Sequence, residues 1–140
     1  TMGRMTLRFT TAQIDTPVLA DPRLLERELL THLLEARPRL RACYPLPYLR
    51  WTVRDSMKLA APFRFEVVAA YRMFLLLRFD VAPGFFKQAD IARALADARV
   101  PAMDRWARLG EPEFGDAWLQ AREFDGAGEW RTAFWNDSDD

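Results

Sequence analysis

The clearest pattern in the chain is a stripe of leucines on one face of a predicted helix that begins at Asp21–Pro22. Leu25, Leu29 and Leu33 recur every four residues, which places them one above another on an α-helix. The aspartate is suited to cap the first turn, and proline is well tolerated at the first helical position. Pro38 disfavours helical geometry in the residue before it, so the helix should end there.

The stretch Phe63–Val81 supports two interpretations. Every odd-numbered position is apolar and charges stand only at even positions, which is the period of a strand with one buried face. An unbroken strand over this stretch would be far longer than the mean of about 5–6 residues. Pro62 suits the start of a helix and Pro83–Gly84 suits its end. We therefore predict a central buried helix, with two strands or one bent strand as the alternative.

The rest of the N-terminal half holds smaller predicted elements. Thr6–Ile14 is rich in threonine and large apolar residues and predicts a strand. Asp15–Ala20 contains Pro17 and is interpreted as a turn region. Arg39–Pro47 is expected to be irregular because of its prolines. The alternation of Leu49–Val53 indicates a short strand.

Three shorter helices are expected in the C-terminal half, over Phe85–Ala98, Pro101–Leu109 and Pro112–Phe124. Together the patterns predict a mostly α fold: a single domain over residues 1–140, built as a small bundle of four to five helices with a minor β element near the N-terminus. Residues 1–5 are interpreted as a remnant of cloning or an alternative start. Residues 126–140 are interpreted as a glycine-rich hinge, an aromatic segment and an acidic tail.

The composition excludes several classes of protein. A chain of 140 residues corresponds to one domain with a sizeable core. One cysteine and one histidine exclude an intrachain disulfide, a Cys/His zinc cluster and most haem ligation. We find no signal peptide, and the most apolar stretch, Phe63–Val81, carries five charges. We therefore expect a cytoplasmic protein with no membrane contact, no metal and no cofactor.

Equal numbers of basic and acidic residues hide an uneven distribution of charge. Residues 1–60 carry ten basic and six acidic side chains, whereas residues 111–140 carry two and nine. Eighteen of the twenty basic residues are arginines, whose guanidinium groups can bind a carboxylate or phosphate through two hydrogen bonds. The distribution indicates a basic surface for an acidic or phosphate-bearing partner. The simpler alternative is an ordinary solvated surface, on which the acidic C-terminal residues contact the basic remainder of the same chain.

Two groups of residues are the candidates for binding that partner. The first is an arginine-rich loop in which Tyr44, Tyr48 and Trp51 alternate with the cations, a mixture that suits anionic peptides or stacked bases. The second is an aromatic cluster beyond the glycine-rich hinge, of the kind that fills pockets on partner proteins. The alternative is that both groups pack within the domain. The predicted partner-binding residues are Arg39, Arg41, Arg50, Arg54, Trp130, Phe134 and Trp135.

A second functional hypothesis rests on the segment Gln88–Trp106, which resembles a helix-turn-helix. Its turn is about one residue longer than usual, and Asp97 and Asp104 oppose phosphate binding. The hypothesis is a nucleic-acid-binding regulator of helix-turn-helix or winged-helix type, or the same shape reused to recognise a peptide in a peptide-modifying system. Its candidate residues are Arg99, Arg105 and Arg108.

Support for an enzyme is thin. His32 lies near Glu28 and Glu35, a combination that can perform acid–base chemistry, but a half-buried structural histidine explains it more simply. Cys43 has no histidine near it in the sequence to activate a thiolate, and no recognisable catalytic motif is present. We therefore predict no catalytic residue. The favoured hypothesis is a non-enzymatic interaction module, an adaptor or accessory subunit that binds an acidic protein or peptide or a second copy of the chain.

Overall fold

The computed structural model describes residues 11–124, which form eight α-helices and four short 3₁₀ helices and contain no β-strand. The α-helices are α2 (Thr11–Ala20), α3 (Pro22–Ala36), α4 (Arg39–Cys43), α5 (Leu46–Ala60), α6 (Val68–Asp80), α7 (Ala89–Leu95), α8 (Ala102–Leu109) and α9 (Gly115–Ala121). The 3₁₀ helices are η1 (Ala61–Phe63), η2 (Phe85–Lys87), η3 (Pro112–Phe114) and η4 (Arg122–Phe124). The predicted mostly α class is confirmed, whereas the count of four to five helices and the minor β element are wrong.

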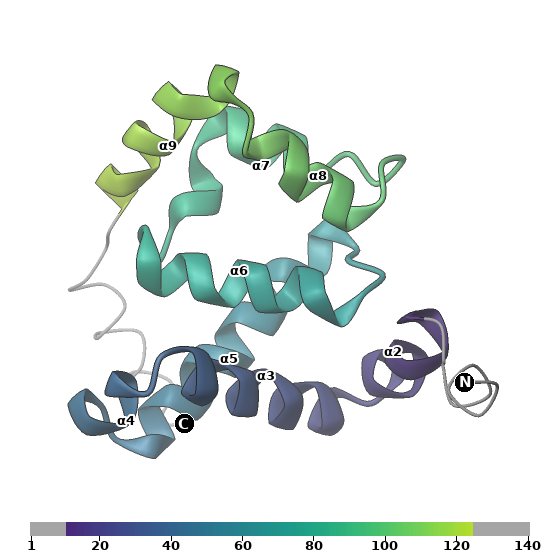
Figure 1. The fold of residues 1–140 in the computed structure, drawn as a ribbon, viewed down its shortest axis with the longest axis vertical. Helices are drawn as coiled ribbons and strands as arrows, with labels where there is room; N and C mark the ends of the chain where they lie inside the picture. Colours follow the sequence, from purple (N-terminus) through teal and green to yellow (C-terminus); the bar gives the residue numbers. More distant parts are fainter. Residues whose placement is uncertain (1–10, 125–140) are drawn as a thin grey trace, which may run out of the picture.

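Helix α6 lies at the centre of the fold (Figure 1). On one side it packs against α2, α3 and α5, and on the other against α8. The first side contains a leucine-rich core to which α6 contributes Val68 and Leu75. The second side contains a larger aromatic core to which α6 contributes Ala70 and Phe74. The two cores therefore share one helix.

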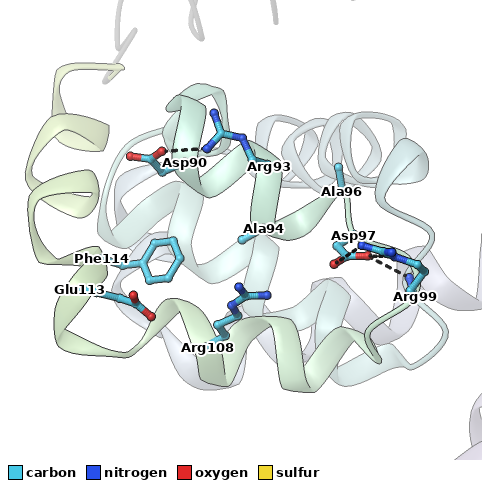
Figure 2. A pocket seen from close by; sticks show the side chains of 9 residues that line it. All are labelled: Asp90, Arg93, Ala94, Ala96, Asp97, Arg99, Arg108, Glu113 and Phe114. Atoms are coloured by element: carbon cyan, nitrogen blue, oxygen red, sulfur yellow. Dashed lines mark hydrogen bonds and ion pairs between the residues drawn. The ribbon is translucent and has the colours of Figure 1, made fainter.

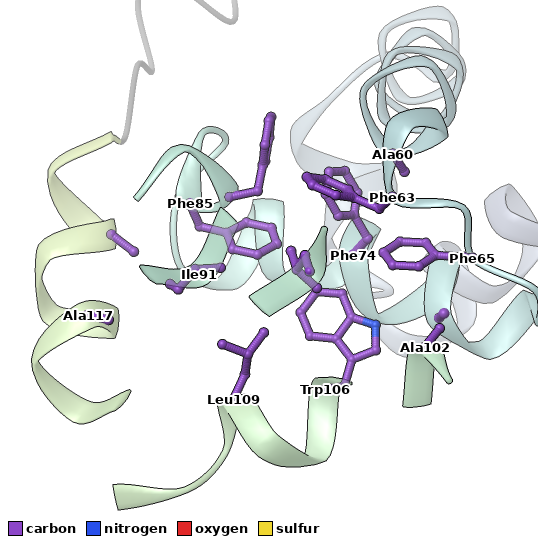
Figure 3. Close-up of a cluster of buried hydrophobic side chains, with 14 of the residues drawn as sticks. Ala60, Phe63, Phe65, Phe74, Phe85, Ile91, Ala102, Trp106, Leu109 and Ala117 are labelled. Atoms are coloured by element: carbon purple, nitrogen blue, oxygen red, sulfur yellow. The ribbon is translucent and has the colours of Figure 1, made fainter. Parts of the chain in front are cut away.

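The buried side chains of the aromatic core come from every element after α5 except η3 and η4 (Figure 3), and the half-buried Phe114 of η3 packs against them. The ring of Phe74 lies 5.0 Å from that of Phe86 and 5.4 Å from that of Phe85, measured between ring centroids. The ring of Phe65 lies 6.0 Å from that of Trp106. All three pairs are tilted, whereas Phe65 and Phe74 meet edge-on, and aromatic quadrupoles favour such arrangements over a face-to-face sandwich. Burial of such large rings anchors α8 and α9 onto α6.

The position of α6 explains why the pattern of Phe63–Val81 was ambiguous. A helix that is buried on two sides has no single apolar stripe. Its charged residues therefore stand near its ends or at positions where another side chain can pair with them. The predicted buried helix is confirmed for Val68–Asp80, and the strand alternatives are wrong. The helix begins five residues later than predicted because Phe63 belongs to η1 and Arg64 adopts a left-handed conformation with φ 53°, which ends η1 and turns the chain.

Helix α3 confirms the leucine stripe. The carboxylate of Asp21 accepts a hydrogen bond of 2.9 Å from the backbone N–H of Arg23, as expected for an N-cap. Leu25, Leu29 and Leu33 are all buried. The helix ends at Ala36, one residue before the predicted limit of Arg37. Local signals were sufficient here because cap, stripe and terminating proline all act within a few residues.

Three predictions for the N-terminal half are wrong. The predicted strand Thr6–Ile14 is helical from Thr11 on, and its residues 6–10 lie outside the described part of the chain. The predicted turn Asp15–Ala20 is the rest of α2, which tolerates Pro17 inside it. The predicted strand Leu49–Val53 lies within the long helix α5. Five alternating residues fit either period, and packing of α5 against α3 and α6 selects the helix.

The structure contains more helix than predicted between α3 and α5, and less α-helix than predicted after α6. The region Arg39–Pro47, predicted to be irregular, contains the short helix α4 and the start of α5. The three predicted C-terminal helices exist, but each is shorter than expected. Helix α8 matches best: it is preceded by Pro101 and ends at Gly110, as the proline and glycine indicated.

Candidate functional site

Helices α4 and α5 carry the candidate surface, in a part of the chain that is rich in arginine. Residues 36–54 contain five arginines and no aspartate or glutamate. The predicted residues Arg39 and Arg41 lie on α4, and Arg50 and Arg54 lie on α5. All four are exposed. We call these four residues the arginine surface.

Two of the five arginines are neutralised by carboxylates from other helices. Arg54 donates from Nε to Glu26 Oε1 of α3 over 2.7 Å. Arg37 donates from Nε to one carboxylate oxygen of Asp80 over 3.0 Å and from Nη2 to the other. These hydrogen bonds and the charge of Asp80 raise the pKa of Arg37. Both pairs tie this region to neighbouring helices, and within the described residues Arg54 is therefore the one residue of the arginine surface whose charge is already compensated.

The other three arginines have no such partner. Within residues 11–124, neither a hydrogen bond nor an ion pair engages the side chains of Arg39, Arg41 and Arg50. They stand where α4 meets the first turns of α5, at one end of the molecule (Figure 1). Three positive charges of this kind repel one another in the free protein, and an acidic partner would relieve that repulsion.

A stack of aromatic rings fixes α4 against α5. The rings of Tyr44 and Tyr48 lie 5.1 Å apart with an interplanar angle of 26°, and those of Tyr48 and Trp51 lie 6.1 Å apart with an angle of 29°. Tyr44 is 38% exposed, whereas Trp51 is buried. The stack therefore runs from the surface into the protein and gives the arginine surface a rigid base.

The second group of predicted partner-binding residues cannot be placed. Trp130, Phe134 and Trp135 lie outside residues 11–124, as does the acidic tail. Their role in binding stays a prediction from the sequence.

The helix-turn-helix hypothesis required three outward-facing arginines, Arg99 before α8 and Arg105 and Arg108 on it, and the structure corrects one of them. Arg105 is buried, with only 1% of its side chain exposed. Its Nη1 donates to the carbonyls of Phe63 and Leu95 over 2.6 and 2.7 Å, and its Nε donates to that of Val100 over 2.7 Å. Arg105 is therefore a structural residue that satisfies buried backbone oxygens.

The remaining two arginines of that hypothesis are exposed. Arg99 is neutralised locally, because its Nε lies 3.0 Å from Asp97 Oδ1. Arg108 forms no ion pair with any residue of the described chain. It lines a cleft of about 630 Å³ between α7, α8 and η3 (Figure 2). Sequence analysis missed this cleft because Glu113 and Phe114, which close it, come near α7 only through the tertiary fold.

The two residues considered for catalysis gain no support. His32 is half-buried on α3, as expected for a structural histidine. Cys43 is exposed at the end of α4. In the described residues, no three His, Cys, Asp or Glu side chains converge on a point where they could bind a metal ion. None of the helices between residues 11 and 124 combines the length and the apolar character needed to cross a membrane.

Comparison of the chain with models of known protein families, with curated proteins and with solved structures gives no match. The geometry above is therefore the basis of the functional proposal.

Proposed function

We propose that the protein is an interaction module that binds an acidic surface of another protein through the arginine surface on α4 and α5. The observation that carries the proposal is the set of three exposed arginines, Arg39, Arg41 and Arg50, for which the described chain offers no carboxylate. Elsewhere in the described part of the chain, a carboxylate lies beside each of the arginines Arg37, Arg54, Arg78 and Arg105. An adaptor or accessory subunit is the kind of protein for which such a surface is useful.

Long-range attraction and short-range contact would have separate origins at this surface. Exposed cations speed association with an acidic partner and orient it. Salt weakens this effect, because at physiological ionic strength charges separated by more than about 8–10 Å are largely screened. Guanidinium groups then form paired hydrogen bonds with carboxylates. The partly exposed ring of Tyr44 offers apolar area beside them. The stack beneath keeps this area in place before binding, which lowers the entropy lost on association.

The same observations give less support to a nucleic-acid reader built on α7 and α8. Of its three arginines, Arg105 is buried and Arg99 is paired with Asp97. The exposed carboxylate of Asp104 on α8 would also face phosphates unfavourably. A single unpaired cation, Arg108, is too little for a protein that must neutralise several phosphates.

Poly-L-glutamate is a suitable probe for the proposed acidic partner. We expect the labelled polymer to bind the protein, and the triple variant Arg39→Gln/Arg41→Gln/Arg50→Gln to bind it at least about tenfold more weakly, or about 1.4 kcal/mol. The matched control, Arg23→Gln/Arg27→Gln/Arg122→Gln, removes the same charge from exposed positions elsewhere. Fluorescence anisotropy at low and moderate salt measures both, and a labelled DNA duplex serves as the competing probe.

Equal losses in the two triple variants would mean that only net charge matters, and would contradict the proposal. Tighter binding of the duplex than of poly-L-glutamate, with the same dependence on the three arginines, would replace the acidic protein partner with nucleic acid. Thermal unfolding of each variant shows whether the fold is intact, which is expected because all substituted side chains are exposed.

A further inference from the structure

The cleft between α7, α8 and η3 lies on the opposite side of α6 from the arginine surface (Figures 1 and 2). Its volume of about 630 Å³ falls among the ~300–1,000 Å³ typical of small-molecule sites. Three carboxylates and three guanidinium groups line it, so its formal charge is zero. A formal charge of zero by itself gives no reason to expect an ion to bind. However, only some of these charged groups form an ion pair with another residue.

Four of the six charges form two pairs at the edge of the cleft. Arg93 Nη1 lies 3.4 Å from Asp90 Oδ1 on α7. Arg99 Nε lies 3.0 Å from Asp97 Oδ1. The hydrogen bond from Arg99, aided by the charge of Arg108, lowers the pKa of Asp97. Each of these groups already has a partner for its charge.

The last two charges do not. Arg108, in the final turn of α8, and Glu113, in η3, are exposed and form no ion pair within residues 11–124, either with each other or with a third group. Figure 2 shows the guanidinium of Arg108 pointing up into the space between α7 and α8, with Glu113 beside it at the left of the cleft. The cleft thus offers a cation and an anion that form no ion pair within the described chain, and of the two the charge of Arg108 also acts on Asp97.

An apolar surface lies beside these two groups. The ring of Phe114 projects into the cleft (Figure 2) and is half-buried because it also packs against the aromatic core. Opposite it, α7 presents Ala94, and the short side chain leaves the space open. Since the core holds the ring from behind, the surface is formed before any ligand arrives.

We propose that this cleft binds a short zwitterion with an aromatic body, namely a free aromatic amino acid or a dipeptide. The ligand's carboxylate binds the guanidinium of Arg108 through two hydrogen bonds, and its ammonium group binds the carboxylate of Glu113. Its aromatic side chain packs on Phe114. This site is independent of the arginine surface and of the function proposed for it.

The arrangement of charges favours a zwitterion over a simple ion. An anion bound at Arg108 would lie close to the negative charge of Glu113, and a cation bound at Glu113 would lie close to Arg108. A ligand with both charges satisfies both groups, and each contact is a charge-assisted hydrogen bond that adds to the affinity. Because both side chains are exposed, solvent reduces that contribution, so the aromatic contact is needed for useful affinity.

Phenylalanyl-alanine is the probe for this proposal, and isothermal calorimetry of the full chain is the measurement. We expect binding at millimolar or lower concentration, weakened at least about fivefold by Arg108→Gln, by Glu113→Gln and by Phe114→Ala. Arg122→Gln, an exposed arginine in η4 outside the cleft, is the matched control and should bind like the unaltered protein. Alanyl-alanine should bind more weakly than the aromatic dipeptide.

Blocked dipeptides assign each charge to its partner. The C-terminal amide should bind the unaltered protein more weakly, and Arg108→Gln should weaken it no further. The N-acetyl form should behave in the same way toward Glu113→Gln. Binding of the blocked forms as tight as that of the free dipeptide, equal losses in Arg108→Gln and Arg122→Gln, or no heat at millimolar dipeptide would each overturn the proposal.

Discussion

Arg105 is the residue whose environment differs most from what its type suggests. An arginine in the middle of a surface helix would ordinarily face water, yet this one is enclosed by η1, α7 and the turn before α8. Its guanidinium lies 5.7 Å from the centroid of the Phe65 ring and 3.6 Å from the carboxylate of Glu66. A buried cation is tolerated here because backbone carbonyls, an aromatic face and a carboxylate surround it.

Replacing Arg105 should therefore destabilise the fold. We expect Arg105→Met to lower the free energy of unfolding by about 3 kcal/mol or more, because the carbonyls of Phe63 and Leu95, which are buried, and that of Val100, which is partly buried, lose their donor. Arg105→Lys should also destabilise, since an ammonium group cannot reproduce the planar fork. Urea denaturation measures both, with Arg99→Gln, expected within about 0.5 kcal/mol of the unaltered protein, as the exposed control. A change of that small size in Arg105→Met would contradict the structural role.

Tyr71 gives a prediction for alkaline pH. Burial raises the pKa of its phenol above the ordinary value of 10.0, so the folded protein holds this proton more tightly than the unfolded chain does. The corresponding stability is fully present below pH 10 and is lost as the pH rises through the folded pKa. We expect Tyr71→Phe to reduce the loss of stability between about pH 9 and 11. Urea denaturation of Tyr71→Phe and of the unaltered protein across this range measures the difference, and equal alkaline losses would contradict the prediction.

At the scale of elements, two helices are capped by side chains from distant parts of the chain. The N-cap positions of α6 and α8 are Val67 and Pro101, neither of which has a capping side chain. Instead Asp15 Oδ2, from α2, accepts the N–H of Val68 over 2.7 Å. Glu66 Oε1 accepts the N–H of Ala102 over 2.7 Å. The two carboxylates also lie at the positive ends of the helix dipoles, where a negative charge is stabilising. The same contacts therefore both pack and cap these helices.

The cap from Asp15 can be tested directly. Asp15→Ala should lower the free energy of unfolding by about 1–2 kcal/mol, because the N–H of Val68 is buried and loses its acceptor. Asp15→Asn should lower it less, since an amide oxygen still accepts a hydrogen bond. Asp21→Ala, at the local cap of α3, provides the comparison at about 1 kcal/mol. Equal stability of Asp15→Ala and the unaltered protein in chemical denaturation would show that the distant cap contributes nothing.

At the scale of the whole molecule, the shared helix α6 joins the leucine-rich and aromatic cores. Neither core is complete without it, because each loses two or more buried side chains when α6 is absent. Neighbouring buried residues of the same helix serve opposite cores: Phe74 faces the aromatic one and Leu75 the leucine-rich one. We therefore expect residues 11–124 to unfold as one cooperative unit rather than as two layers.

Substitutions at these two neighbours test that cooperativity. Phe74→Ala should lower the free energy of unfolding by about 3–5 kcal/mol and Leu75→Ala by about 2–5 kcal/mol. Tryptophan fluorescence reports all five tryptophans of the chain, of which Trp106 and Trp118 lie in or beside the aromatic core and Trp51 lies on α5. In both variants it should follow the same transition as far-ultraviolet circular dichroism. Two separated transitions in Leu75→Ala would show that the layers unfold independently.

The candidate sites could be predicted from the sequence only in part. The sequence shows that residues 36–54 contain five arginines and no aspartate or glutamate. The structure adds that the four residues of the arginine surface are exposed, as a binding role requires. The exposure of Arg108 and the burial of Arg105 are not visible, although both stand on the same helix, because the difference arises from which elements pack against each side of α8. The same holds for Glu113 and Phe114, whose place in the cleft depends on how the chain folds back after Gly110.

The amino-acid sequence alone determined the features that depend on residues within one or two helical turns: the leucine stripe and cap of α3, the proline and glycine around α8, and the mostly helical class. The tertiary structure decided where α6 begins, that Leu49–Val53 is helical, which arginines are buried and which charges lack a partner. The physical reason is range. Capping, helical period and backbone restriction act between near neighbours in the chain, whereas burial and charge pairing depend on helices that meet only in the folded molecule.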